Sequence, residues 1–194
     1  KGQELITNAE VSNTIQTVQT ADSAVLGFVD AFGGLPGDVE NADVRIPNCG
    51  AAPCLPGVPA AANRGNRQVE NAAANDFGGA ITADSEAHAF FIQLTEADFL
   101  SGIGGDAVQT DIDNYPEVPV GQNGMVQVNY ADGITDTYTD GVDGVPALVR
   151  RGHYMIMHGD PGNAIDAGFI EQAIAARIDR KLDDGTANTG DVIA

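Results

Sequence analysis

Basic residues are scarce in this sequence. The chain has 9 Lys and Arg against 28 Asp and Glu, which gives a formal net charge of -19 at pH 7. A surface of this sign repels the phosphates of nucleic acids and the head groups of anionic lipids. We therefore expect no nucleic acid among the partners. Either solvated acidic faces or divalent cations that bridge carboxylates account for the excess charge, and the pattern favours solvated faces.

A long apolar run is also lacking. No stretch approaches the roughly 20 apolar residues that a membrane-spanning helix needs. Hydrophobic residues nevertheless make up 43% of the 194 residues, which is typical of a globular domain and not of a disordered chain. The sequence therefore predicts a single domain over residues 1–194.

Cysteine is limited to Cys49 and Cys54. Two thiols without a second pair or a nearby histidine do not make a structural zinc site, and their spacing is not that of a Cys-x-x-Cys redox motif. The spacing favours a disulfide that closes a small loop, with free buried thiols as the alternative. A disulfide would place the chain in an oxidising compartment outside the cytoplasm.

Known catalytic motifs are absent. The sequence has no Gly-x-Ser-x-Gly elbow, His-Glu-x-x-His pair, Walker loop or Gly-x-Gly-x-x-Gly after a strand. Of the three histidines, His88 falls in a predicted helix, whereas His153 and His158 are five apart on a predicted strand and so point to opposite faces. Asp183 and Asp184 adjoin a glycine turn, but nothing nearby suggests a nucleophile or a cleft. We predict that the protein is not an enzyme.

Helical spacing of apolar residues marks the start of the chain, residues 1–32. We predict one long helix from Leu5 to Phe32, and its apolar stripe comprises Val11, Ile15, Val18, Val25, Val29 and Phe32. A Gly-Gly-Leu-Pro-Gly turn then stops the helix. Residues 33–79 are rich in proline and glycine, which predicts a long ordered loop region.

Residues 80–194 contain the other predicted elements. These are a helix over 85–100, strands over 125–130, 144–150 and 153–158, and a helix over 164–181. The strand at 153–158 is apolar on both faces, so we expect it at the centre of the sheet. Strands this close in sequence favour an antiparallel meander. The predicted fold class is α+β, with the long N-terminal helix packed on a small antiparallel sheet and additional helices.

Three segments resemble type IV pilins and pseudopilins, and they occur in the order expected for that family. They are residues 28–38 (FVDAFGGLPGD) with Asn41 and Ala42, residues 88–100 around HAFFIQL, and residues 176–192, which contain IDRKLDDG. In one branch of the family the long first helix ends at a Leu-Pro-Gly-Asp turn, and the chain closes on an Ile-Asp-x-Lys-x-Asp-Asp-Gly run. The sequence departs from the family in having neither the membrane-spanning half of that helix nor its processing site.

The resemblance implies a structural subunit, a major or minor pilin, of a type IV pilus-like filament that acts in adhesion, motility or uptake. The implied partners are further copies of the chain, other pilins or pseudopilins, and the inner membrane, reached by an N-terminal helix of the full-length protein. The expected location is an extracellular pilus or the periplasm, with membrane anchoring before assembly. The alternatives are a type II secretion pseudopilin of a periplasmic filament and a secreted acidic module that binds through calcium.

Calcium is the one cofactor that the sequence suggests. Asp136, Asp140 and Asp143 lie among turn residues, and carboxylate oxygens suit hard cations. They lack the ligand order of an EF-hand, so acidic turn residues that face water are the alternative. Some major pseudopilins hold calcium in a loop of the sheet region, but their ligands do not match this sequence residue by residue.

Overall fold

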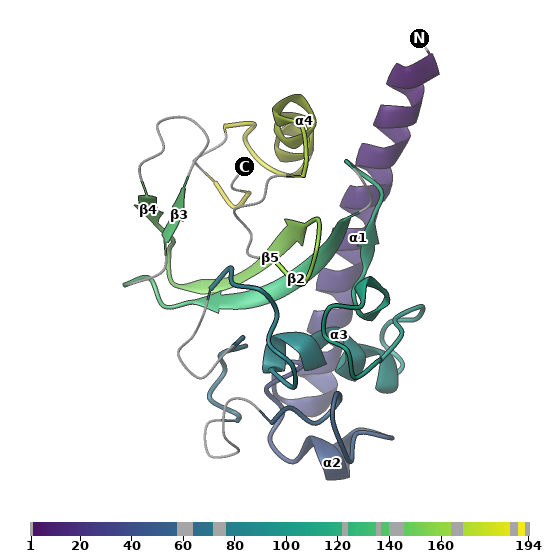
Figure 1. The fold of residues 1–194 in the computed structure, drawn as a ribbon, viewed down its shortest axis with the longest axis vertical. Helices are drawn as coiled ribbons and strands as arrows, with labels where there is room; N and C mark the ends of the chain where they lie inside the picture. Colours follow the sequence, from purple (N-terminus) through teal and green to yellow (C-terminus); the bar gives the residue numbers. More distant parts are fainter. Residues whose placement is uncertain are drawn as a thin grey trace.

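The structure is a computed structural model that describes residues 2–57, 64–71, 77–121, 124–134, 137–139, 146–163, 169–186 and 190–192. Its fold is α+β, as the sequence predicts: a long N-terminal helix, a small antiparallel sheet and further helices. The long helix, α1 (Gly2–Phe32), runs along one side of the molecule, and the sheet crosses towards it (Figure 1).

The end of α1 is set by glycine, as the sequence predicts. The Gly33 N–H donates to the carbonyl oxygen of Val29 at 2.8 Å, and Gly33 has a φ of +69°. Residues with a side chain rarely adopt that φ, whereas glycine adopts it without strain. Glycine at position 33 therefore lets the helix end there at little cost in free energy. The short helix α2 (Ala42–Arg45) follows the turn.

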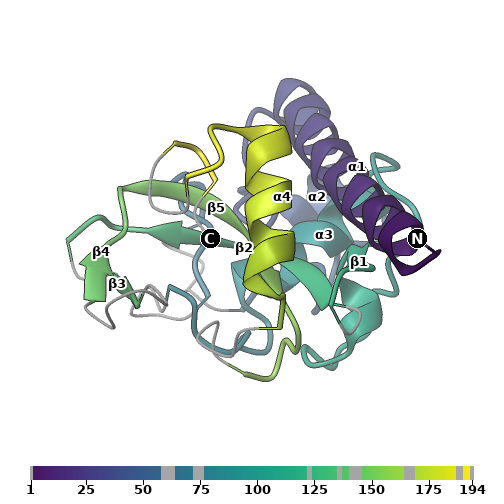
Figure 2. The ribbon, with the colours of Figure 1, turned by 90° about the horizontal axis from the view of Figure 1, so that it is seen from above.

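The main sheet has the strand order β1-β2-β5, and both pairings are antiparallel. Its strands are β1 (Glu117–Val118), β2 (Gly124–Ala131) and β5 (Gly152–His158). Every residue of β2 is buried. Two helices, α3 (Glu86–Glu96) and α4 (Gln172–Leu182), lie on opposite sides of the sheet and so cover both faces of β2 (Figures 1 and 2).

The expectation that residues 153–158 form the central strand is wrong. In the described part of the sheet that segment is β5, at an edge, and β2 is the strand with a partner on each side. Most of β5 is only partly buried, although Met155, Ile156 and Met157 are apolar. Continuous apolar composition therefore identified a strand here but not its place in the sheet.

A second sheet pairs β3 (Thr137–Thr139) with β4 (Pro146–Leu148), antiparallel. The predicted strand over 144–150 corresponds to β4, and it joins this hairpin and not the main sheet. The 3-10 turn η2 (Ile112–Asn114) precedes β1.

The helix boundaries differ from those predicted. Ser85 caps α3 by accepting from the His88 N–H at 3.1 Å, and the helix ends at Glu96 and not at residue 100. The last helix begins at Gln172, so Phe169 and Ile170 precede it, and residues 164–168 lie outside the described chain.

Phe169 packs against backbone and does not form part of a helix stripe. A Cβ on Gly124 would lie 2.3 Å from the ring of Phe169, and one on Gly121 would lie 2.5 Å from its carbonyl oxygen. Glycines in β2 and in the turn before it therefore create the space for this ring. That tertiary contact explains why Phe169 does not extend α4.

Candidate functional site

The N-terminal end of α1 is the most exposed regular element of the described chain. Figure 1 shows its first turns extending beyond the body of the molecule, and Figure 2 shows the same end lying outside the sheet and α4. Residues 2–6 are all exposed, and among them Leu5 and Ile6 are 71% and 61% exposed. Isolated helical turns are marginal in water, so most helical stability comes from packing of an apolar face. This end of α1 therefore presents apolar side chains that the described part of the chain leaves exposed.

The same side of α1 carries a further exposed apolar residue. Leu26 is 64% exposed and lies 21 residues after Leu5. Over 21 residues of a straight α-helix, the side-chain direction shifts by only about 60° from an exact seven-residue repeat, so Leu5 and Leu26 point to the same outer side of α1. We call Leu5, Ile6 and Leu26 the outer apolar residues of α1, although Ile6 is turned by about 160° from Leu26 on a straight helix and so does not share its stripe.

The buried side of α1 is turned around the helix axis from the predicted stripe by about one residue position. Its buried residues are Val11, Thr14, Ala21, Ala24 and Phe28. Of the predicted stripe, Val11 is buried, Ile15, Val18, Val25 and Phe32 are partly buried and pack on the core, and Val29 is partly buried. Small residues occupy much of this side because α1 lies close to its neighbours: a Cβ on Gly27 would lie 2.9 Å from the Phe99 ring.

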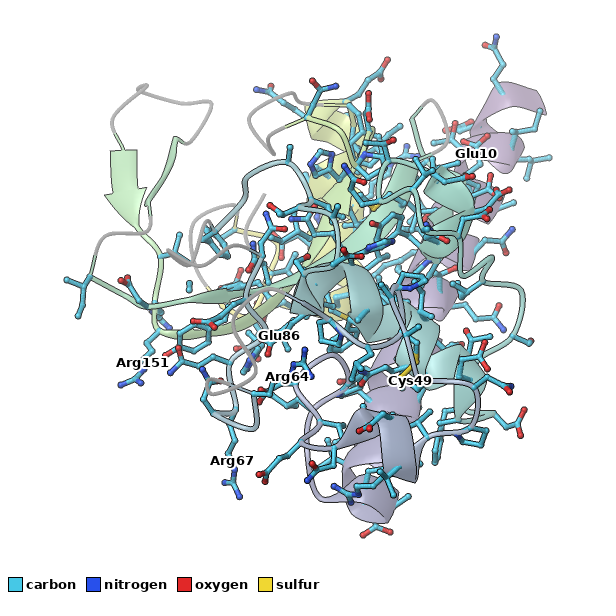
Figure 3. All side chains as sticks on the ribbon, turned by 60° about the horizontal axis from the view of Figure 1, so that its bottom comes forward. Glu10, Cys49, Arg64, Arg67, Glu86 and Arg151 are labelled. Carbon is cyan, nitrogen blue, oxygen red and sulfur yellow. A yellow bond between two sulfur atoms is a disulfide. The ribbon has the colours of Figure 1, made fainter. Side chains whose placement is uncertain are left out.

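Charge on α1 has a single sign. Its charged residues are Glu4, Glu10, Asp22 and Asp30, with no Lys or Arg between Gly2 and Phe32. Exposed arginines lie elsewhere, and Figure 3 shows Arg67 and Arg151 pointing away from the body while Glu10 lies on α1. The molecule therefore presents an acidic helix and separate basic positions, an arrangement that suits contact between unlike surfaces.

A groove of about 600 Å³ runs beside α1. Asn13, Gln16, Thr17 and Thr20 form its helix side, and residues 100–103 and 112–117 form the other. Its helix side is therefore mostly uncharged and polar, with Ala21 as the apolar member.

The predicted disulfide is present. Cys49 and Cys54 are joined at an S–S distance of 2.05 Å, and both side chains are buried. Residues 50–52 between them are exposed, so the bond shapes a small surface loop. The alternative of free buried thiols is excluded, since the structure has no free cysteine.

A buried glutamine fastens this loop to the turn after α1. The side chain of Gln93 on α3 accepts from the Gly37 N–H at 2.7 Å and donates to the carbonyl oxygen of Cys54 at 2.8 Å. Gly37 has a φ of +82°, and a Cβ there would lie 2.3 Å from the carbonyl oxygen of Glu86. The Leu-Pro-Gly-Asp turn is therefore packed directly on the start of α3.

Three carboxyl groups meet below this turn: Asp38, Glu70 and Glu86. Asp38 accepts from the Arg67 N–H at 2.6 Å and the Gly65 N–H at 2.5 Å, and Glu86 accepts from the Glu70 N–H at 3.0 Å. Figure 3 shows Glu86 in the interior. Burial raises the pKa of Glu86 to about 9; the Glu70 N–H opposes that rise, and the charges of Asp38 and Glu70 add to it. Burial also raises the pKa of Asp38 and of Glu70.

Asp38 and Glu86 both accept hydrogen bonds from backbone N–H groups of residues 65–70. Burial and the neighbouring charges of Asp38 and Glu70 raise the pKa of Glu86 to about 9, so Glu86 is protonated at neutral pH. The Asp38 carboxylate in turn organises the backbone of residues 65–67. The prediction from sequence missed this cluster, because the three residues are 16 or more positions apart and only the fold brings them together.

The histidines lie apart from one another. His88 is buried on α3, with its Nε2 3.4 Å from Asn114 Nδ2, and burial lowers its pKa. His153 Nε2 accepts from the Val69 N–H at 3.2 Å, and His158 Nδ1 accepts from the Asp160 N–H at 3.2 Å. Each described histidine therefore has a structural contact in its own part of the fold.

The acidic residues predicted to bind calcium, Asp136, Asp140 and Asp143, lie outside the described residues. The segment Thr137–Thr139 between the first two is β3.

Comparison with protein-family models, curated proteins and solved structures found no match. Within the described part of the chain, no helix has the length and apolar character that crossing a membrane requires. Function is therefore inferred from the residues and their geometry.

Proposed function

We propose that this chain is the head of a structural subunit of a type IV pilus-like filament, with α1 as its assembly element. The observation that supports the proposal is the exposed end of α1, where Leu5 and Ile6 have no cover within the described chain. A helix that extends from a folded body and presents apolar side chains is suited to pack on a helix or groove of another subunit.

The shape of the subunit favours an open assembly. A contact in which the exposed end of α1 packs on a different patch of the next copy is heterologous. Heterologous contacts that do not close into a ring produce helical filaments. The acidic side chains of α1 would meet basic positions of the next subunit, such as Arg45 and Arg67, both of which are exposed.

Partners and location follow from the same proposal. The partners are further copies of the chain and related subunits, with the inner membrane as the site of anchoring before assembly. We place the filament outside the cell. A pseudopilin in a short periplasmic filament is the alternative that the experiment distinguishes.

The test is electron microscopy of cells that produce the protein from its complete gene. An antibody against the exposed loop at residues 50–52 labels the subunit, because that loop follows α2, which lies at the opposite end of α1 from Leu5 and Ile6 (Figure 1). Surface filaments decorated by the antibody support a pilin, and decorated filaments confined to the periplasm support the pseudopilin. Dispersed protein with no filament in either compartment overturns the proposal.

Paired variants test the assembly surface itself. Replacing Leu5 and Ile6 by Glu removes the apolar side chains at the end of α1, whereas Val44→Glu changes an 81% exposed apolar residue on α2. We expect filaments to be lost in the first variant and kept in the second, with equal melting temperatures of the purified heads. Filaments that persist with Leu5→Glu and Ile6→Glu would show that this end of α1 is not the contact.

A further inference from the structure

Three carboxylates gather at the C-terminal end of α4. Asp179 is on the helix, Asp183 is its C-cap and Asp184 follows. Asp179 and Asp183 are four residues apart and so share one side of the helix. One oxygen from each of the three carboxylates lies within 4.8 Å of the other two.

Asp179 is buried with an unpaired oxygen. Its side chain is 0% exposed, its Oδ1 accepts from the Gly185 N–H at 3.2 Å, and its Oδ2 has no hydrogen-bond partner. A buried carboxylate oxygen is unfavourable unless a hydrogen bond or a cation compensates for the lost water. This oxygen is therefore a position at which a positive ligand would stabilise the protein.

The neighbouring basic side chains on α4 point to a different element. Arg177 donates to Asn8 Oδ1 at 3.5 Å and Lys181 donates to Ser12 Oγ at 3.3 Å, both on α1. They hold α4 against α1. These two side chains are therefore engaged with α1, while the stem of the third basic residue of α4, Arg180, lies against Gly185.

The other two carboxylates are held in position by backbone. Asp183 Oδ2 accepts from the Val192 N–H at 3.1 Å and from the Asp191 N–H, and Asp184 Oδ1 accepts from the Thr186 N–H at 2.7 Å. Asp183 is partly buried and Asp184 is exposed. The cluster therefore runs from a buried side chain to a solvent-exposed one, so an ion bound there could keep water among its ligands.

We propose that Asp179, Asp183 and Asp184 bind one calcium ion. Calcium–oxygen distances are about 2.3–2.6 Å, so two oxygens on one ion lie up to about 5 Å apart, which accommodates this cluster. An all-oxygen donor set selects a hard cation over zinc or copper. The cluster also lies at the end of α4 that carries the negative helix dipole and carbonyl groups without helical partners.

Calcium at this position would join the end of α4 to residues 190–192 through Asp183. The same helix is held to α1 through Arg177 and Lys181. The ion would thus stabilise the position of α4 on the body. This role does not depend on whether the protein forms filaments.

The test is calorimetric titration of calcium chloride into protein stripped with EDTA, in about 0.15 M KCl to screen diffuse binding to the acidic surface. We expect one saturable site and a higher melting temperature with calcium, because a ligand that binds only the folded state stabilises it. Asp183→Asn and Asp184→Asn remove charge but keep an oxygen that accepts from the same backbone N–H groups. Each should weaken calcium binding by at least about tenfold, since ligand charge tunes calcium affinity over several orders of magnitude.

The matched control replaces Asp136, Asp140 and Asp143 by Asn together, which removes three acids from the other candidate position. Calcium binding that survives in this control but is lost in Asp183→Asn supports the proposal. Calcium binding that is unchanged in Asp183→Asn and Asp184→Asn, or lost only in the control, overturns it. The absence of a saturable site in the unmodified protein also overturns it. Circular dichroism of each stripped variant checks that the fold is retained.

Discussion

Replacing Glu86 by Gln should change how the stability of the protein depends on pH. Glu86 is 0% exposed, and its pKa is raised from 4.5 to about 9, chiefly by burial. Between those values the folded state keeps a proton that the unfolded chain has lost. Stability attributable to this group is therefore fully present below pH 4.5 and falls as pH rises towards 9.

The size of the effect follows from linkage. One proton that is bound only in the folded state lowers the free energy of unfolding by up to about 1.4 kcal/mol for each pH unit. From about pH 5 to about pH 8 the loss approaches about 4 kcal/mol, a large part of the roughly 5–15 kcal/mol that stabilises a typical domain. Glutamine is neutral at all these pH values and close to the protonated acid in size, so Glu86→Gln should lack this loss.

The assay is urea unfolding of Glu86→Gln and the unmodified protein at several pH values across that window. We expect the variant to gain stability relative to the unmodified protein as pH rises. Glu117→Gln, which changes an exposed carboxyl on β1, is the matched control and should show a constant difference. A constant difference for Glu86→Gln, or a relative loss of stability at high pH, would refute a protonated Glu86.

Two further predictions concern stability. Replacing Cys49 and Cys54 by Ala should lower the free energy of unfolding by about 2 kcal/mol, because the disulfide closes a short loop. The variant should also lose any effect of reductant on the midpoint of urea unfolding. A midpoint that stays sensitive to reductant would contradict this prediction. Phe28→Ala should lower the free energy of unfolding by about 3–5 kcal/mol in the same assay, since Phe28 is fully buried and its ring centroid lies 4.5 Å from that of Phe32. Val29→Ala should lower it by less than about 1 kcal/mol. Equal losses in the two variants would show that Phe28 does not lie on the inner side of α1.

The comparison of Phe28 with Val29 also shows how far the sequence could predict α1. The length and end of the helix followed from its apolar spacing and from Gly33. Its orientation did not, because hydrophobic periodicity weights large aliphatic residues, whereas the close approach of Phe99 at Gly27 places small residues such as Ala24 on the inner side. Which side faces inwards is decided by a residue 72 positions away.

The sheet and the acidic cluster show the same limit. The pattern in 125–130 and 153–158 predicted two strands, but strand order depends on which of them has a partner on both sides, and that is tertiary information. Asp179 and Asp183 had a readable signal in their four-residue spacing. The burial of Asp179, which makes the cluster a candidate site, depends on the docking of α4.

The segments that resemble pilins in sequence lie at the joints between α1 and the rest of the molecule. The Leu-Pro-Gly-Asp turn is bonded to α3 through Gly37 and Gln93, and the last segment is bonded to α1 through Arg177 and Lys181. These joints fix the angle between α1 and the body. A filament subunit needs that angle fixed, because each subunit positions the next and an error in one contact accumulates along an open assembly. The short sequence segments therefore hold α1 at the angle to the body that the proposed function requires.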